Sequence, residues 1–182
     1  LGPDMLVDVY QLLQEANELV QKGVDRPLER VTIHKNAPLI TPFNTFINQA
    51  KEIRRGADRH GSCGKGIYET RCDSRTLNEK LLMAGDLRQP NELKEKLLYL
   101  REIKRTVVTT ELADEIQDPQ NEAKIFFDDH FIEDTIGVYL EVAKYVNIDD
   151  GAVLKKFLNG NEQVIFEAAQ GVLLDEQYGF HP

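Results

Sequence analysis

A short apolar run near the C-terminus, Val164-Ile165-Phe166, most constrains what this chain can fold into. β-Branched and aromatic residues in such a run are typical of a buried strand. The run leads into Ala168-Ala169-Gln170-Gly171, and small residues at the end of a strand let a ligand approach the backbone closely. In open α/β sheets, ligands bind at the carboxyl ends of strands. The pattern indicates either a binding turn in which Gln170 contacts a polar ring edge, or an ordinary turn that Gln170 caps.

A second segment, Lys51–Thr70, concentrates positive charge in an otherwise acidic chain. It contains Gly56, Gly61, Gly64 and Gly66. Glycine permits positive φ values and exposes backbone N–H groups, so such a loop can form a nest for an anion. It is not a Walker A loop, because Gly64-Lys65 is followed by glycine and not by serine or threonine. The alternative interpretation is a solvated basic loop without a ligand.

Three segments resemble motifs of adenylosuccinate synthetases and occur in that family's order. Phe166 to Asp175, continued by Gly179 and Pro182, resembles the family's purine-base loop, F-E-G-A-Q-G-x-L-L-D-x-x-x-G-x-x-P. Gly61-Ser62-Cys63-Gly64-Lys65-Gly66-Ile67 is similar to the G-T-T-G-x-G-I loop that holds the nucleotide's phosphate. Arg30 to Asn44 is similar to a strand that ends in a Leu-Pro-Tyr-His-like turn. About residues 76–160 match only in length and helical character.

The resemblance implies a helix-rich α/β fold, a fragment of the P-loop NTPase-like synthetase fold, with strands at about 30–35 and 163–168. Residues 1–182 would form one domain. Within it, residues 1–73 and 161–182 would carry the sheet and the nucleotide-binding loops, and residues 74–160 an inserted helical subdomain. The family's N-terminal phosphate loop and C-terminal guanine-binding region have no counterpart in the sequence. We therefore expect the central portion of a larger enzyme, inactive by itself and without catalytic residues of its own.

The resemblance also implies a site for inosine monophosphate (IMP). Gln170 and Gly171 would contact the purine, and Ser62, Cys63 and Gly64 would hold the 5′-phosphate. Cys63 departs from the family pattern, which has threonine at that place. Since a thiol is a poorer hydrogen-bond donor than a hydroxyl, Ser62 is the stronger candidate for the phosphate contact.

One arginine of the family reaches across a dimer interface to the partner's nucleotide. Arg75 is our choice for that role, and Arg71 is the alternative within reach. Because the bridge after the phosphate loop is shortened to Tyr68-Glu69-Thr70-Arg71, neither arginine aligns cleanly. The alternative for either residue is a surface arginine that pairs with a nearby acidic side chain and has no role in binding.

In the family, GTP phosphorylates the six-position oxygen of IMP, and the amine of L-aspartate then displaces the phosphate. The resemblance therefore implies GTP and Mg²⁺ for the parent enzyme, neither of them bound by this portion alone, together with IMP, L-aspartate and a homodimer. Two alternatives remain open. One is a divergent paralogue that acts on another purine monophosphate; the other is a non-catalytic helical module for binding or oligomerisation.

Composition argues against several other classes. A net charge of −9 disfavours a nucleic-acid binder, which needs clustered Lys and Arg. No apolar run approaches the ~20 residues of a membrane span, and no signal peptide is visible. The two cysteines, Cys63 and Cys72, build no disulfide framework, so we expect a reducing, cytoplasmic compartment.

Two groups of potential metal ligands lack the features of a metal site. His60, Cys63 and Cys72 lack the fourth ligand of a structural zinc site. The acidic stretch Asp128–Asp134 lacks the Glu-x-x-His spacing of carboxylate-bridged metal bundles, so a solvated turn is expected.

Apolar periodicity predicts most of the remaining chain to be helical. The predicted helices cover residues 5–22, Phe43 to Arg55, Ser74 to Gly85, Pro90 or Asn91 to Asp118-Pro119 with a break or kink at Thr106–Thr110, Gln120 to Val146 as two helices with a bend near Asp128–His130, and Asp150 to Leu158.

Overall fold

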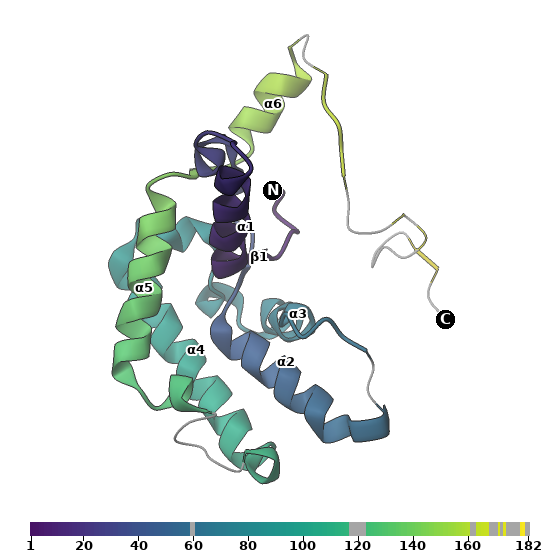
Figure 1. Cartoon of the computed structure of the whole chain (residues 1–182), viewed down its shortest axis with the longest axis vertical. Coiled ribbons are helices and arrows are strands. Elements are labelled where there is room, and N and C mark those ends of the chain that lie inside the picture. The colour runs from purple at the N-terminus through teal and green to yellow at the C-terminus, as the bar shows by residue number, and fades with distance from the viewer. Residues whose placement is uncertain are drawn as a thin grey trace. The chain divides into compact units, whose positions relative to one another are not determined.

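A computed structural model describes residues 1–58, 61–116, 123–160, 163–167, 171, 173 and 179–180. Contacts divide the chain into two compact units, Leu1–Asp150 and Gly151–Pro182. The first unit holds five helices and two small sheets within its described residues (Figure 1). In the second unit, the described residues contain one α-helix, α6 (Ala152–Leu158). The predicted boundaries of a helical subdomain at 74–160 stay a prediction.

The helices of the first unit are connected by short 3₁₀ turns. They are α1 (Val9–Gln21), α2 (Pro42–Arg55), α3 (Ile67–Thr76), α4 (Pro90–Thr110) and α5 (Asp129–Ala143). The 3₁₀ turns are Pro27–Arg30, Gly56–Asp58, Asn78–Lys80, Ala84–Arg88, Ala113–Glu115 and Lys124–Phe126. No helix in the described ranges is long and apolar enough to cross a membrane.

Two parallel strand pairs complete the first unit. β1 (Val7–Asp8) pairs with β3 (Leu39–Ile40), and β2 (Thr32–His34) pairs with β4 (Asn147–Asp149). The predicted helix-rich α/β class is confirmed, and β2 confirms the strand expected at 30–35.

The strand expected at 163–168 is not found, since residues 163–167 form no strand and residue 168 lies outside the described residues. Ile165 and Phe166 in this stretch are 85% and 73% exposed. A strand requires hydrogen bonds to a neighbouring strand, and no described residue supplies them here. Apolar composition alone therefore did not determine the structure of this stretch.

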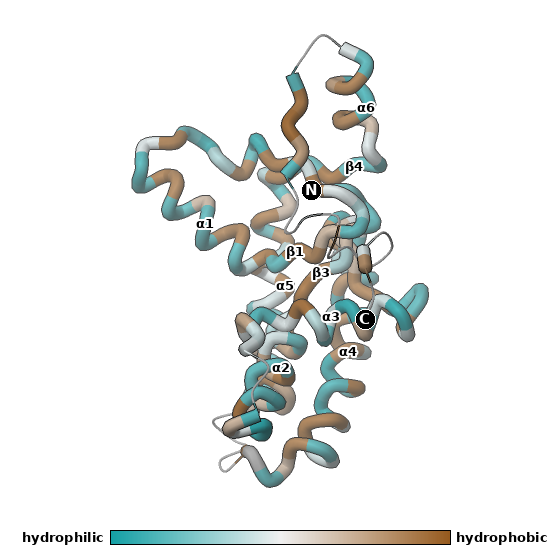
Figure 2. Tube along the Cα trace, turned by 90° about the vertical axis from the view of Figure 1, so that its right-hand side faces the viewer, coloured by the Kyte–Doolittle hydropathy of each residue, from teal (hydrophilic) through white to brown (hydrophobic). Residues whose placement is uncertain are grey.

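The hydrophobic core of the first unit lies where α2, α4 and α5 meet. Its buried side chains include Phe43, Ile47, Leu97, Leu100, Phe126, Ile132 and Tyr139. The Tyr139 hydroxyl donates to the carbonyl of Ile40 at 3.2 Å, so its buried polar atom is satisfied. Figure 2 shows hydrophobic colouring where β1 and β3 lie side by side, and these paired strands lead directly into α1 and α2.

The prediction of a helix that starts at Ser74 is wrong. The helix in this region is α3, which begins at Ile67 after Gly66 and ends at Thr76. Ser74 lies inside it and donates to the carbonyl of Arg71 at 2.8 Å. Asn78, at φ +47°, then turns the chain into a 3₁₀ segment. Gly66, in the left-handed conformation, is the N-cap of α3, so the helix begins seven residues before the position at which Ser74 was expected to cap it.

The break or kink predicted in α4 is also absent. The helix continues through Thr106 to Thr110. The Thr106 hydroxyl donates to the carbonyl of Glu102 at 3.1 Å, and that of Thr110 to the carbonyl of Thr106 at 2.8 Å. Threonine hydroxyls bonded one turn back are compatible with a helix, which offsets the weak helix propensity of β-branched residues. The helix ends at Thr110, whereas the sequence predicted its end at Asp118-Pro119.

The acidic stretch at Asp128 forms the start of α5. Asp128 is the N-cap, and its Oδ1 accepts from the N–H of His130 at 2.9 Å. Asp129 pairs with Arg101 at 2.7 Å. Among the described residues, no group of three or more His, Cys, Asp or Glu side chains is arranged to hold a metal ion. These carboxylates therefore have structural partners.

The cap predicts a pH-dependent stability of α5. The backbone hydrogen bond from His130 lowers the pKa of Asp128. Because the folded-state pKa lies below the unfolded one, this contribution is present above about pH 4 and is lost as the pH falls through the folded-state value. We expect Asp128→Ala to lower the melting temperature at neutral pH and Asp128→Asn, which keeps an acceptor, to lower it less. Thermal melts from pH 7 to 2 should show the wild-type advantage over Asp128→Asn disappear in acid; an advantage that persists would contradict this explanation.

Candidate functional site

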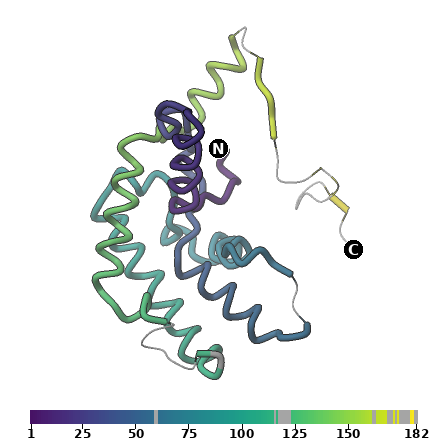
Figure 3. Tube along the Cα trace, in the orientation of Figure 1, coloured from purple at the N-terminus to yellow at the C-terminus, as the bar shows by residue number. Residues whose placement is uncertain are grey.

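The glycine-punctuated loop, residues 61–66, connects the end of α2 to α3. After α2 the chain turns back, so that α3 lies beside α2 (Figure 3). Arg59 and His60, which precede the loop, lie outside the described residues. The loop therefore lies against a face of the helix that precedes it.

That face of α2 is polar. It consists of Thr45, Asn48, Gln49 and Glu52, which are spaced three and four residues apart and so lie on one side of the helix. Thr45 Oγ1 donates to the carbonyl of Lys65 at 3.4 Å, and Gln49 Nε2 donates to the carbonyl of Gly64 at 3.1 Å. The carbonyl groups of the loop are thus turned toward α2.

Asn48 contacts both ends of the loop. Its Oδ1 accepts from the N–H of Gly66 at 3.2 Å, and its Nδ2 donates to the hydroxyl of Ser62 at 3.3 Å. Asn48 is only 6% exposed. A buried amide with both functions satisfied holds its partners in defined positions.

Gly66 is the closest approach of the loop to α2. Its φ is +77°, a conformation that L side chains rarely adopt. A Cβ atom at this position would lie 2.7 Å from the backbone N of Thr45 and 2.8 Å from the carbonyl carbon of Asn44. The loop therefore requires glycine here for both conformation and space.

The structure places the three predicted phosphate ligands at the outer side of this loop. Ser62 and Cys63 are exposed and Gly64 is half-buried. Within the described part of the chain, no protein group accepts a hydrogen bond from the N–H of Cys63 or Gly64. The N–H of Ser62 donates to a carboxylate oxygen of Glu52 at 3.4 Å. An anion bound at this loop would find two available N–H groups and would compete with Glu52 for the third.

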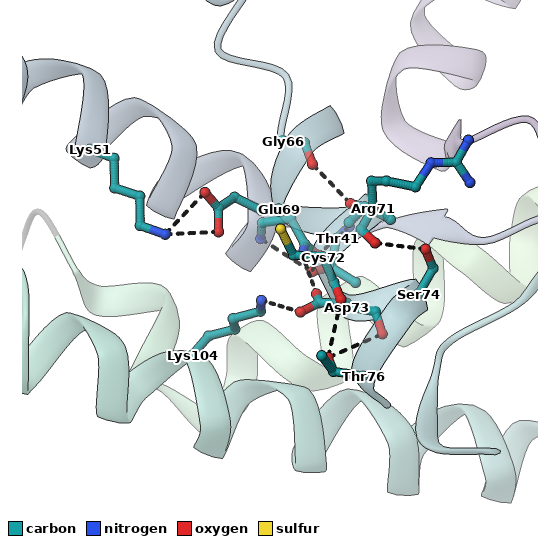
Figure 4. Close-up of polar contacts among 12 residues, drawn as sticks. Thr41, Lys51, Gly66, Glu69, Arg71, Cys72, Asp73, Ser74, Thr76 and Lys104 are labelled. Atoms are coloured by element: carbon teal, nitrogen blue, oxygen red, sulfur yellow. Dashed lines mark hydrogen bonds and ion pairs between the residues drawn. The ribbon is translucent and has the colours of Figure 1, made fainter. Parts of the chain in front are cut away.

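The basic residues of this region that the structure describes have structural partners. Lys65 Nζ donates to Gln11 Oε1 at 2.9 Å, and Arg54 donates to the carbonyl of Glu111 at 2.7 Å. Lys51 pairs with Glu69 at 3.1 Å (Figure 4). Among the described residues of the loop, the groups available to an anion are therefore backbone N–H groups rather than unpaired cations.

A buried polar network lies behind the loop and connects α2, α3 and α4. Asp73 accepts from Asn44 Nδ2 at 2.6 Å and from Lys104 Nζ (Figure 4). Asn44, Asp73 and Lys104 are 1%, 6% and 5% exposed. Asn44 also forms a capping box with Thr41 at the start of α2. The network fixes α3, and with it the C-terminal end of the loop, against two other helices.

The network as a whole has no signal in the sequence. Asn44 has a recognisable signal, because Thr41-Pro42 followed by a polar residue at the third helical position resembles a capping box. Asp73 and Lys104 have none, since charged residues on helices are exposed by default.

The two candidate arginines both lie on α3. Arg75 is exposed and Arg71 is half-buried, and the guanidinium group of Arg71 points away from Asp73 (Figure 4). Gln170 lies outside the described residues, and Gly171 is exposed and belongs to the second unit. The expectation that the Gln170 turn and the Ser62 turn contact one nucleotide stays a prediction.

A groove of about 510 Å³ adjoins the C-terminal end of the loop. Its lining is mostly apolar and consists of Leu1, Met5, Leu6, Val7, Asp8, Gln11, Leu12, Glu15, Ile40, Lys65 and Ile67. Nearby, a hydrogen bond with Cys72 raises the pKa of Tyr68.

Comparison with known proteins agrees with these motifs. The family model for adenylosuccinate synthetase matches residues 1–182. The adenylosuccinate synthetase of Desulforapulum autotrophicum is 29% identical over 185 residues, which cover all of this chain and 40% of that protein. That of Neisseria meningitidis serogroup A is 31% identical over 188 residues, covering all of this chain and 39% of that protein. The chain thus spans about 40% of the length of these curated relatives. It belongs to the adenylosuccinate synthetase family.

Proposed function

We propose that this chain is the IMP-binding portion of a GTP-dependent ligase that joins IMP and L-aspartate. The observation that supports it best is the loop at 61–66, where the N–H groups of Cys63 and Gly64 donate to no described protein group. In the proposed complex these groups and Ser62 bind the 5′-phosphate, and Glu52 moves away from the N–H of Ser62. Gln170 and Gly171 contact the purine, and Arg75, or Arg71, reaches the nucleotide of a partner subunit.

GTP and Mg²⁺ belong to the proposed reaction of the complete gene product. GTP supplies the phosphoryl group that turns the six-position oxygen into a good leaving group, and Mg²⁺ neutralises phosphate charge. In this proposal neither cofactor is assigned to the residues of this chain. This chain's own part is to hold IMP in place as a cytoplasmic homodimer, without catalytic residues of its own.

The proposal is tested by calorimetric titration of the complete gene product with IMP and with inosine, which lacks the phosphate. We expect IMP to bind more tightly than inosine. Gln170→Ala should weaken IMP binding about 10-fold or more, because it removes hydrogen bonds to the purine. Gln163→Ala, at an exposed glutamine in the same unit, is the matched control and should leave binding unchanged.

Two results would contradict the proposal. Equal affinity for IMP and inosine would exclude the phosphate site, and an unaltered affinity of Gln170→Ala would exclude the purine contact. Selective binding of a different purine monophosphate would favour a divergent paralogue. Absence of nucleotide binding would favour a helical module for binding or oligomerisation.

A further inference from the structure

We infer that Asn48 is the positioning residue of the phosphate-binding loop. It deepens the proposed function and rests on it. Asn48 lies in the middle of α2, belongs to neither family motif quoted for the loop or the purine turn, and is not itself placed to contact a ligand.

The two hydrogen bonds of Asn48 join the ends of the loop. Its Oδ1 accepts from the N–H of Gly66, and its Nδ2 donates to the hydroxyl of Ser62. Cys63 and Gly64 lie between these two anchored residues. A single buried side chain therefore sets the distance across which the available N–H groups are presented.

The other loop contacts of α2 cannot replace Asn48. Thr45 and Gln49 bond to carbonyl groups of Lys65 and Gly64, and Gln49 is exposed. Glu52, the other residue of α2 that bonds to Ser62, accepts from its backbone N–H, so the contact to the Ser62 hydroxyl comes from Asn48. It also satisfies the N–H of Gly66 at the position where backbone and helix approach most closely.

The bond to Ser62 has a consequence for the ligand. The hydroxyl of Ser62 can accept from Asn48 Nδ2, which leaves its own proton available to a phosphate oxygen. In the other direction, the same hydroxyl lies 3.5 Å from Asn48 Oδ1. The shorter of the two contacts, in which Asn48 Nδ2 is the donor, leaves the Ser62 hydroxyl available as a donor, which partly offsets the weak donor at Cys63.

The experiment compares IMP with inosine in variants of the complete gene product. Asn48→Ala should weaken IMP binding about tenfold and leave inosine binding within about twofold, because only the phosphate contact depends on the loop. The KM for IMP should rise while kcat at saturating IMP stays near the wild-type value, as expected when uniform binding is lost. Asn48→Asp keeps an acceptor for the N–H of Gly66 but removes the donor to the Ser62 hydroxyl and adds a negative charge near the phosphate, so it should not recover the affinity.

Asn147→Ala is the matched control, since Asn147 also donates to a hydroxyl, that of Thr32, at 3.5 Å in the β2–β4 pair. It should leave both affinities unchanged. Asn48→Ser is the second variant, because it keeps a polar group but is too short to span Ser62 and Gly66; the same selective loss is expected even if Asn48→Ala folds poorly.

If Asn48 had only a structural role, its substitution would weaken the binding of IMP and of inosine equally. That result, or no change in either affinity, overturns the inference. Failure of the proposed function looks different. The wild-type protein would then bind IMP no better than inosine, whatever the variants do.

Discussion

Gly66→Ala is expected to destabilise the protein by more than about 3 kcal/mol. The left-handed conformation costs an L residue about 1–2 kcal/mol, and overlap with the backbone of α2 adds strain that no side-chain rotation relieves. The new Cβ atom would lie 2.7 Å from the N of Thr45 and 2.8 Å from the carbonyl carbon of Asn44. Urea denaturation followed by circular dichroism measures the effect as a lower midpoint at an unchanged slope.

Two other glycines serve as controls for this prediction. Gly137 lies within α5 with nothing within 4 Å of an added Cβ, so Gly137→Ala should stabilise by up to about 1 kcal/mol. Gly64 has φ +67°, but an added Cβ would meet only the flexible side chain of Gln49 at 3.3 Å. Gly64→Ala should therefore cost less than Gly66→Ala. A loss below about 1 kcal/mol for Gly66→Ala would mean that the loop does not lie against α2 as described.

Lys104→Met is expected to cost about 3–5 kcal/mol, because it leaves the carboxylate of Asp73 buried without its cation. The side chains of Lys104 and Asp73 are 7% and 8% exposed, so water cannot compensate for the lost partner. Asn44 Nδ2 remains as a donor to Asp73 but carries no net charge. Chemical denaturation of the variant measures the loss.

A double-mutant cycle separates the ion pair from simple packing. In Asp73→Asn/Lys104→Met no buried charge remains, and the amide at position 73 can still accept from Asn44. The double variant should therefore be more stable than Lys104→Met alone, with a coupling of about 2 kcal/mol or more. Additive losses would show that the two side chains do not form the buried pair.

The sequence predicts α2 well because of its apolar periodicity. Phe43 and Ile47 recur at helical spacing and fall on one face, which is buried, and Arg55 marks the end of this pattern; Pro42, expected in a loop, is the first residue of the helix. The same rules miss Asn44 and Asn48, which are buried on this helix as well. Amide side chains are exposed on average, and only the three-dimensional positions of Asp73 and Ser62 explain their burial.

In α4 the apolar stripe identifies the helix but not all of its buried face. Leu93, Leu97 and Leu100 are buried as the period predicts, whereas Ile103 is only half-buried and Lys104 is buried in its place. The pairing of Lys104 with Asp73 on another helix turns a charged residue inward. Hydrophobic periodicity contains no information about such a partner.

The candidate loop was found because glycines and a family motif mark it, but its support on α2 was not. Ser62, Cys63 and Gly64 are neighbours in sequence, so their proximity follows from the motif itself. Their anchor is Asn48, a residue fourteen positions from Ser62 that no local pattern connects to them. Long-range side-chain contacts of this kind are determined by packing rather than by local propensity.

A crystal structure of the complete gene product with IMP tests most directly whether the loop at 61–66 binds the nucleotide's phosphate. We predict the 5′-phosphate oxygens at about 3 Å from the backbone N atoms of Cys63 and Gly64 and from the hydroxyl of Ser62. The carboxylate of Glu52 should no longer accept from the N–H of Ser62. A phosphate bound at another part of the protein, with Glu52 still bonded to Ser62, would contradict the proposed role of the loop.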